Sequence, residues 1–285
     1  MPRASSNARE EIRIADVIAE QAPRVARRLG RFGLWFVGVM IGQRPFGRTL
    51  RRVYGATPHA FIRSAVATLD LRIDVRGAEL LPDSPEVIVV ANHPTGGAEG
   101  IVLLKLLLDR YGSVIVPANR LLCRLQALSP VIAPVHIFDK GPSKTRVPEA
   151  LVPPGTPLLL FPAGRTARER GGVMREFPWK RGFIRLARRS GRMIVPVCVV
   201  TRPSRLFRTI ATVRRLLHCP INIEMFLLVR EVLLRRRRVT LVVEHPVASD
   251  DFAGDPTDAV RAERIQKMVE VTYAEYRKSD PAPVG

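Results

Sequence analysis

From residue 71 onward, short apolar runs rich in β-branched residues alternate with longer stretches in which apolar positions recur at helical spacing. The short runs predict strands, and the longer stretches predict amphipathic helices. The predicted strands cover residues 71–76, 86–91, 113–118, 134–138, 157–161, 193–200 and 238–244. The predicted helices cover 99–110, 119–127, 144–150, 179–190, 203–217, 222–236 and 256–278. This alternation predicts an α/β fold with a central, largely parallel sheet of about seven strands flanked by helices.

The first 70 residues follow a different pattern. Residues 8–30 predict a helix that ends in a group of arginines, and the apolar stretch "FGLWFVGVMI" follows at 32–41. About ten apolar residues are roughly half of what a membrane-spanning helix needs. Basic flanks and an aromatic pair suit a segment lying at a membrane interface, although a buried core helix has the same apolar pattern. We therefore divide the chain into an N-terminal helical, membrane-interface segment, 1–70, and an α/β domain, 71–285.

The charge of the chain is unusual for a globular protein. Lys and Arg number 46 against 26 Asp and Glu, for a formal net charge of +20. This balance attracts either nucleic acid or an anionic membrane face. The arginine run at 235–238 ends a predicted helix, where the helix dipole favours positive charge, and aromatic residues that could stack on bases are sparse. We therefore expect an anionic membrane surface as a partner and disfavour nucleic acid.

The cysteines and the N-terminus bear on the compartment. Three cysteines at wide spacing predict neither a disulfide framework nor a zinc site. The N-terminal stretch has mixed charge and lacks the apolar core of a signal peptide. We expect no metal and no bound cofactor, and a peripheral or monotopic location on the cytoplasmic face of the membrane.

The stretch "VANHPTGGAE", residues 90–99, contains the candidate chemistry. In open α/β sheets, functional groups gather beyond the carboxyl ends of strands, and His93 follows the strand 86–91 directly. Gly96 and Gly97 permit a tight turn, which places Glu99 in the first turn of the next helix. A carboxylate that meets a histidine fixes its tautomer and stabilises the imidazolium. Because no nucleophilic Ser or Cys accompanies the pair, His93 would act on a hydroxyl or water of the substrate.

A simpler interpretation of the same stretch remains open. His93 could be a turn residue bonded to backbone, with Glu99 a favourable charge at a helix N-terminus. Two further strand ends favour the catalytic interpretation, because they bring arginines to the same edge of the sheet. "FPAGRTARERGG" places Gly164 and Arg165 after one strand, and "VPANRLLCR" places Arg120 and Arg124 after another. Glycine turns and arginines suit an anionic group, and either Arg120 or Arg124 could make the phosphate contact.

Four motifs together resemble a known family. "NHPTGGAE" (92–99), "FPAG" (161–164), "PWKRGF" (178–183) and "MIVPV" (193–197) are similar to motifs of the glycerophospholipid acyltransferase superfamily, of the lysophosphatidic-acid-acyltransferase type. The closest likeness is to its hemolysin-like and lyso-ornithine-lipid acyltransferase branch. The resemblance covers about residues 70–250.

The resemblance implies an O-acyltransferase. The acyl group would move from acyl-CoA or acyl carrier protein, as co-substrate, to the hydroxyl of a lysophospholipid resembling 1-acylglycerol-3-phosphate, or of a lyso-ornithine lipid. His93 would be the general base and Glu99 its partner, with no acyl-enzyme. Backbone N–H groups near Gly96, Gly97 or Gly164 are candidate oxyanion donors.

The chain departs from the family pattern at several positions. The acidic partner, Glu99, lies one residue further from the histidine than in the commonest pattern and is Glu rather than Asp. Arg165 and Ala167 replace the Glu and Ser usual after the third motif, which predicts a more anionic acceptor or a reduced activity. Two hypotheses of other kinds remain: a non-catalytic lipid- or nucleic-acid-binding protein on the same fold, and a hydrolase in which His93 activates water.

Overall fold

The central sheet has five strands in the order β1-β9-β8-β2-β5. The computed structural model describes residues 19, 23–41, 55–94, 97–119, 125–135, 153–170, 173–201, 237–248, 251 and 257–279. The strands are β1 (Leu71–Arg76), β2 (Val87–Ala91), β5 (Leu158–Leu160), β8 (Met193–Val200) and β9 (Arg237–Val243). β2 is parallel to β5 and β8, and β1 is parallel to β9, whereas β8 and β9 are antiparallel. The α/β class with a mostly parallel sheet is thus confirmed.

The central sheet is smaller than the predicted seven strands because two of these strands form a separate pair. β3 (Val116–Asn119) and β4 (Ile132–Val135) pair in parallel, and β3 reaches β5 only through the bridge between Ile115 and Leu158. There the Ile115 N–H donates to the Pro157 carbonyl, and its carbonyl accepts from the Leu159 N–H, both at 2.9 Å. The next residue that would donate on this side is Pro117, which has no N–H. The ladder therefore stops at Ile115.

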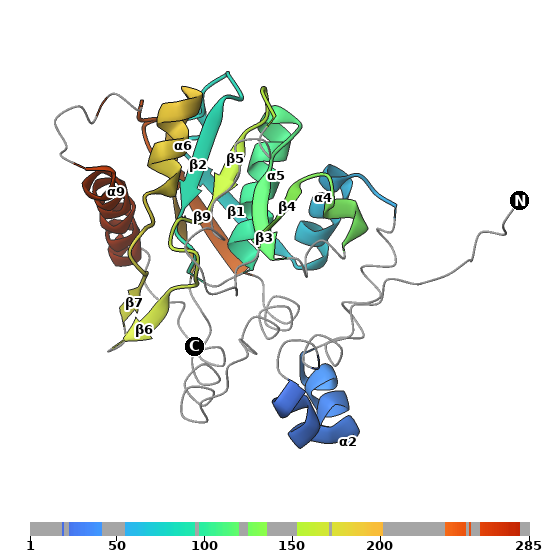
Figure 1. Ribbon diagram of the computed structural model, residues 1–285. Helices are drawn as coiled ribbons and strands as arrows, with labels where there is room; N and C mark the ends of the chain where they lie inside the picture. The colour runs from blue at the N-terminus through green and yellow to red at the C-terminus, as the bar shows by residue number, and fades with distance from the viewer. Residues whose placement is uncertain are drawn as a thin grey trace, which may run out of the picture.

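Helices cover both faces of the sheet, which explains why β2 is apolar at every position. Val87, Val89 and Ala91 pack in the core cluster that contains α4 (Pro58–Thr68) and α5 (Ala98–Tyr111). Ile88 and Val90 pack in a second cluster with α6 (Gly182–Ser190) and α9 (Asp258–Ser279). Figure 1 shows the two helix pairs on opposite sides of the sheet. A parallel strand buried on both faces is expected to be a continuous apolar run.

Several predicted helices are present, and one helix was not predicted. α5, α6 and α9 correspond to predicted helices, whereas 144–150, 203–217 and 222–236 lie outside the described residues. The predicted helix 119–127 is described only at its two ends, as the last residue of β3 and the short helix η3 (Gln126–Leu128). α4 was missed, although it has a clear start signal: Thr57 Oγ accepts from the Ala60 N–H, and a proline follows at the first helical position.

The N-terminal segment contains the helix α2 (Pro23–Ile41), which includes the apolar stretch 32–41. Gly30 interrupts it with φ 60° and ψ −177°. None of the helices in the described ranges combines the length and the apolar content needed to cross a membrane. The division of the chain at residue 70 stays a prediction, and α4, which precedes this boundary, buries Phe61 and Ile62 in the core of the α/β fold.

The fold also includes a small hairpin, in which β6 (Arg168–Arg170) and β7 (Val173–Arg175) pair antiparallel. It follows the "FPAG" turn in the sequence and precedes the "PWKRGF" motif. The hairpin therefore separates two of the motifs that surround the candidate site.

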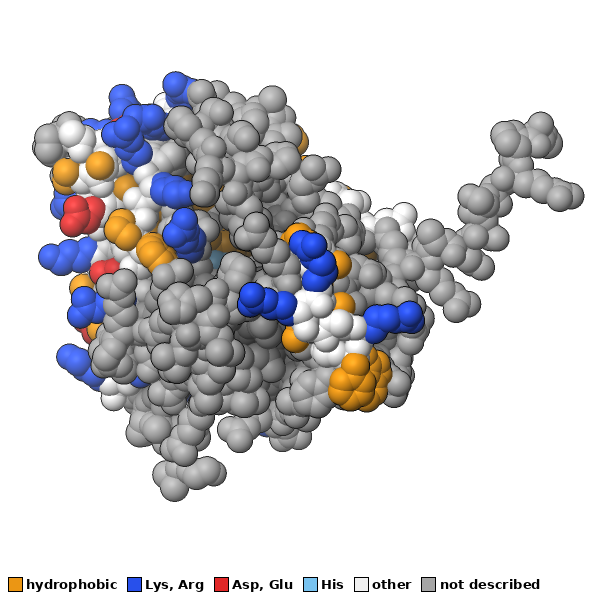
Figure 2. Space-filling model, turned by 60° about the horizontal axis from the view of Figure 1, so that its bottom comes forward, with side chains coloured by type: hydrophobic (Ala, Val, Ile, Leu, Met, Phe, Trp, Pro, Cys, Tyr) orange, Lys and Arg blue, Asp and Glu red, His pale blue; other side chains and the backbone are white. Residues whose placement is uncertain are grey.

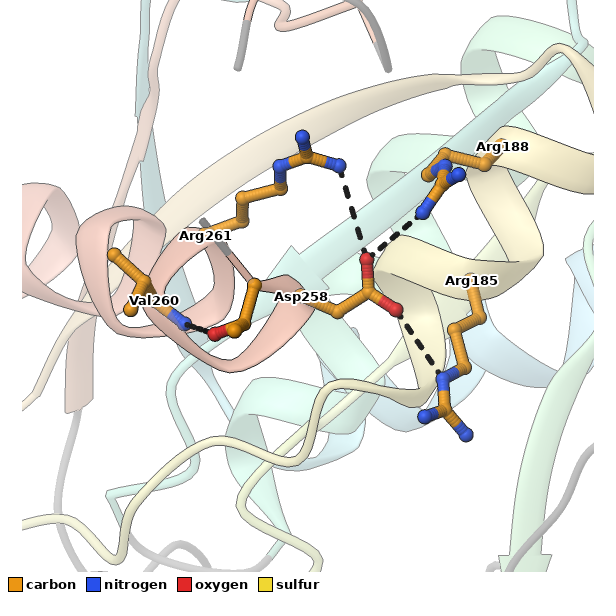
Figure 3. Close-up of polar contacts among 6 residues, drawn as sticks. Arg185, Arg188, Asp258, Val260 and Arg261 are labelled. Atoms are coloured by element: carbon orange, nitrogen blue, oxygen red, sulfur yellow. Dashed lines mark hydrogen bonds and ion pairs between the residues drawn. The ribbon is translucent and has the colours of Figure 1, made fainter. Parts of the chain in front are cut away.

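A cluster of charges joins α9 to α6 (Figure 3). Asp258, in the first turn of α9, accepts from Arg185 Nε at 3.2 Å and from an Arg188 terminal nitrogen at 3.1 Å, both on α6. Arg261, one turn further along α9, lies 3.7 Å from the same carboxylate. Asp258 is mostly buried, with 15% of its side chain exposed, whereas about half of each α6 arginine is exposed. The carboxylate is therefore the central group of the cluster.

We expect Asp258→Asn to lower the stability of the folded chain by about 1 kcal/mol at pH 7. Burial favours the neutral acid, but hydrogen bonds from Arg185 and Arg188 outweigh it and lower the pKa of Asp258. A carboxylate with a lowered pKa in the folded state stabilises the protein above its ordinary pKa, and this stabilisation is lost as the pH falls. The difference between variant and wild type in thermal unfolding should therefore shrink below about pH 4. Glu263→Gln, an exposed carboxylate on the same helix, is the control; an equal loss in both variants would contradict the role of Asp258.

Candidate active site

The site begins with Asn92, which follows β2 and continues its pairing with β8. The Asn92 Nδ2 donates to the Val199 carbonyl at 3.0 Å, and its Oδ1 accepts from the Val199 N–H at 2.6 Å. The side chain is buried, so a primary amide here replaces the two backbone groups that a longer strand would supply. Asn92 thereby fixes the point at which the chain leaves the sheet, one residue before His93.

His93 and Glu99 lie together at the carboxyl end of β2. The His93 Nδ1 is 3.1 Å from a Glu99 carboxylate oxygen, and the Gly97 N–H donates to the other oxygen at 3.3 Å. Glu99 is wholly buried, whereas 20% of the His93 side chain is exposed. The Nδ1 contact is close but lacks hydrogen-bond geometry, so the two side chains meet as a close approach and not as a hydrogen bond. With Nδ1 beside the carboxylate, Nε2 is the nitrogen left to accept a proton.

The buried position of Glu99 is consistent with its place in the first turn of α5. A negative charge is stabilised at a helix N-terminus by the helix dipole and the free N–H groups. α5 ends at Tyr111, and Gly112 follows as its C-cap with a φ of 72°, a conformation that suits glycine. The sequence thus orients the helix so that its positive end faces the candidate site.

Two segments that follow β5 hold the His93 ring and backbone. Phe161 stacks on the imidazole, with the ring centroids 4.3 Å apart and the planes at 29°. The Ala167 N–H donates to the His93 carbonyl at 2.9 Å. The His93 N–H in turn donates to a Glu176 carboxylate oxygen at 2.6 Å. Both backbone groups of His93 are therefore bonded to residues more than 70 positions away in the sequence.

Glu176 is a residue that the sequence analysis missed. It is a lone acidic residue two positions before the "PWKRGF" motif, and it also accepts from the Trp179 Nε1 at 2.9 Å. Burial raises the pKa of Glu176 to about 7, although hydrogen bonds from Trp179 and the His93 backbone act in the opposite direction. A partly buried carboxylate with two N–H donors, next to a candidate catalytic histidine, is a feature that local sequence patterns do not reveal.

The two glycines that were predicted as oxyanion donors and lie in the described ranges already have acceptors for their N–H groups. Gly97 donates to Glu99, and Gly164 donates to the Phe161 carbonyl at 2.9 Å in a tight turn. Gly164 has a φ of 63°, which L-residues rarely adopt. Gly96 lies outside the described residues, so the predicted oxyanion donors stay a prediction.

The predicted anion-binding residues are described only in part. Arg165 is exposed, and its guanidinium carbon lies 5.7 Å from the centre of the Phe177 ring. Lys180 brings a second positive charge to the Gly164 turn. Its Nζ lies 3.2 Å from the point that a Cβ on Gly164 would occupy. Arg120 and Arg124 lie outside the described residues. In the described ranges, His, Cys, Asp and Glu side chains form no group of three that could hold a metal ion.

The family model and two relatives in sequence agree on a chemical class. Residues 16–247 match the model of a family described as acyltransferase. The chain is 27% identical to a lyso-glycine lipid O-acyltransferase of Phocaeicola vulgatus, over 90% of this chain and 94% of that protein. It is 28% identical to a lyso-glycine lipid O-acyltransferase of Bacteroides thetaiotaomicron, over 90% of this chain and 96% of that protein. Among solved structures, the 1-acyl-sn-glycerophosphate (LPA) acyltransferase PlsC from Thermotoga maritima is similar, with a TM-score of 0.44, 14% identity, and coverage of 85% of this chain and 96% of that chain.

We expect Asn92→Ala to destabilise the fold by about 2–5 kcal/mol, because it leaves the N–H and carbonyl of Val199 without their partners in a buried place. Chemical denaturation followed by circular dichroism measures this loss. Gln126→Ala, at an exposed position, should change the free energy of unfolding by less than about 0.5 kcal/mol. Similar effects in the two variants would contradict the proposed pairing of Asn92 with β8.

Proposed function

The chain belongs to the acyltransferase family, and from this premise we propose that it transfers a fatty acyl group from a thioester to the hydroxyl of a lysolipid, with His93 as the general base. The family match confirms that the protein is an acyltransferase, as the sequence motifs indicated. The observation that carries the proposed mechanism is the buried Glu99 carboxylate beside the partly exposed His93 imidazole.

The reaction follows from this pair. As the acceptor oxygen attacks the thioester carbonyl carbon, the hydroxyl proton moves to the His93 Nε2, and Glu99 stabilises the imidazolium that forms. The tetrahedral oxyanion then collapses, the carbon–sulfur bond breaks, and the imidazolium returns the proton to the leaving thiolate. A positioned general base contributes roughly 10²–10⁴-fold to the rate.

A direct transfer is favoured over an acyl-enzyme. Cys198 lies in the interior of β8, and burial raises the pKa of its thiol. A buried neutral thiol is a poor nucleophile. Cys198, the free cysteine within the described residues, therefore acts as a small apolar residue in the core, and we assign the attack to the acceptor hydroxyl.

We infer that the acceptor has an anionic head group, and that a lyso-glycine lipid is the first to test. Two relatives named for this lipid each match 90% of the chain. Arg165 and Lys180 place positive charge next to the Gly164 turn, where the head group's negative charge could bind. A lysophospholipid resembling 1-acylglycerol-3-phosphate and a lyso-ornithine lipid are the alternative acceptors. Acyl-CoA and acyl carrier protein remain alternative donors.

We also infer that α2 attaches the enzyme to an anionic membrane face, on the cytoplasmic side. Phe32 is 77% exposed and Trp35 is 54% exposed, and their ring centroids lie 5.6 Å apart. Arg27, Arg28 and Arg31 of the same helix are exposed. Figure 2 shows an apolar cluster with basic side chains around it where the bottom of the molecule comes forward. Aromatic and basic side chains together suit the interface of an anionic bilayer.

We predict that His93→Ala reduces acyl transfer at least 10²-fold, because the hydroxyl then loses its base. Purified protein is assayed in mixed micelles with lyso-glycine lipid, lyso-ornithine lipid or lysophosphatidic acid, each with palmitoyl-CoA or palmitoyl carrier protein. Mass spectrometry of the diacylated product identifies the accepted pair.

His59→Ala is the control for that variant, since His59 is exposed on α4 and pairs with Asp109 of α5. It should retain the activity of the wild type. If His93→Ala turned over as fast as the wild type, the base assignment would be wrong. Release of free fatty acid at the full rate without an acceptor would instead indicate a hydrolase.

Replacing both Phe32 and Trp35 by alanine should weaken binding to vesicles of phosphatidylglycerol at least tenfold. The two aromatic side chains would otherwise bury apolar surface in the bilayer interface, at about 25 cal/mol per Å². Vesicle co-sedimentation at low and high salt measures this, with Val260→Ala and Val271→Ala on α9 as controls for exposed apolar residues. Unchanged vesicle binding in the double variant would overturn the assignment, and tighter binding to DNA than to vesicles would favour the nucleic-acid hypothesis.

A further inference from the structure

Glu176 lies between β7 and the "PWKRGF" motif, where it receives two N–H groups from different parts of the fold. One of its oxygens accepts from the His93 backbone at 2.6 Å, and the other accepts from the Trp179 indole at 2.9 Å. The first donor belongs to the loop between β2 and α5, which contains the candidate base. The second belongs to the "PWKRGF" motif, which leads into α6. One carboxylate thus connects the histidine to a second, buried residue.

Trp179 is itself held in place, so Glu176 bonds to a fixed group. The Trp179 side chain is buried, and its ring meets Phe183 of α6 edge to face, with centroids 6.0 Å apart. Its backbone N–H donates to the Gln266 Oε1 of α9 at 2.8 Å. The Gln266 Nε2 in turn donates to Glu270 at 2.8 Å. The chain of contacts therefore runs from α9 through Trp179 and Glu176 to His93.

We propose that Glu176 is a positioning residue for acyl transfer: its ionised carboxylate holds the His93 backbone against the fixed Trp179 indole and so keeps the imidazole between Glu99 and the acceptor hydroxyl. This inference rests on the proposed function, because it assumes that His93 is the base. Glu176 forms and breaks no bond in the reaction. It acts through the position of His93 and through its negative charge near the imidazolium.

The two donors favour the ionised form. A carboxylate accepts both N–H groups, whereas a protonated carboxyl group has one oxygen committed as a donor. Charge-assisted hydrogen bonds of this kind are also roughly twice as strong as neutral ones. The Glu176 contacts with His93 and Trp179 should therefore be complete only when the proton has left.

The surroundings of Glu176 bring its ionisation into the pH range of an ordinary assay. Burial raises its pKa to about 7, and the charge of Glu270, from α9, acts in the same direction. The hydrogen bonds from Trp179 and from the His93 backbone, and the charge of His93, lower it. Burial, the charge of Glu244 and the charge of Glu176 all raise the pKa of the Cys198 thiol on β8. Arg165 lies over the ring of the neighbouring Phe177. Positioning should thus improve as the pH rises through about 7.

The kinetic test compares Glu176→Gln with the wild type across pH 5.5–9. A glutamine side chain offers one acceptor oxygen and one amide donor, so it can serve only one of the two N–H groups. We expect kcat to fall about ten- to a hundredfold, as for a displaced catalytic group, with KM changed less than about threefold. In the wild type, kcat should rise with a midpoint near pH 7 as Glu176 ionises. This rise should be absent in Glu176→Gln.

Glu270→Gln is the matched variant, since it removes the carboxylate that raises the pKa of Glu176 and leaves both donors in place. The midpoint of the Glu176 step should move to lower pH, with the plateau activity at high pH retained. If Glu176 had a structural role that did not depend on its ionisation, Glu270→Gln would leave the midpoint of the kcat profile unchanged. Near-unchanged thermal unfolding and circular dichroism establish that both variants fold.

A second measurement does not depend on turnover. The chain has two tryptophans, so Trp35→Phe leaves Trp179 as the single fluorescent reporter at Glu176. We expect its emission to titrate with a midpoint near pH 7, to shift to lower pH with Glu270→Gln, and to lose this transition with Glu176→Gln. If Glu176→Gln does not fold, the Glu270→Gln midpoints in fluorescence and in kcat decide, because the proposal requires them to move together.

The outcomes separate this inference from the proposed function. If Glu176→Gln keeps the kcat and the pH profile of the wild type while His93→Ala is inactive, the positioning role is wrong and the proposed function stands. If His93→Ala is fully active, the proposed function fails and the positioning role fails with it, whatever the fluorescence shows. A Trp179 emission that is flat from pH 5.5 to 9 would also overturn the role of Glu176.

Discussion

The wholly buried carboxylate of Glu99, 3.1 Å from the His93 Nδ1, is the constraint on which the site depends. A buried charge is costly unless nearby groups compensate for it. Two compensations meet here: the Gly97 N–H and the positive end of α5. Each depends on the strand–turn–helix path, because only a helix that starts directly after the turn puts its N-terminus at the carboxyl edge of β2. The fold therefore determines the charge that the histidine experiences.

The histidine is held by its main chain as much as by its ring. Asn92 pairs with β8 immediately before it, Ala167 donates to its carbonyl, and Glu176 accepts from its N–H. With its backbone fixed, His93 keeps a partly exposed imidazole stacked on Phe161, which is the position that the proposed general base needs. Such an arrangement suits the proposed direct transfer, because that reaction needs one base at a defined distance from an incoming hydroxyl and from the acyl carbonyl.

Local patterns predicted the parts of the fold that depend on neighbours in the sequence. All seven predicted strands have a counterpart, and His93 and Glu99 meet because a turn and one helical turn separate them. The seven-strand sheet was wrong because one missing N–H, at Pro117, stops a ladder whose partner lies some forty residues away. Glu176 was missed for a related reason: it bonds to the backbone of a residue 83 positions earlier, and such pairings leave no periodicity.

The side-chain amide of Asn92 has a consequence for how this chain can vary. This amide takes the place of a peptide group of β2, and so it fixes the register of β2 against β8 at the residue directly after the strand. Successive residues of a strand point to opposite faces, so a single insertion or deletion within β2 would send the next residue's side chain to the wrong layer. Length changes should then be tolerated in surface loops but excluded between residues 87 and 93, where only substitutions of similar volume could accumulate.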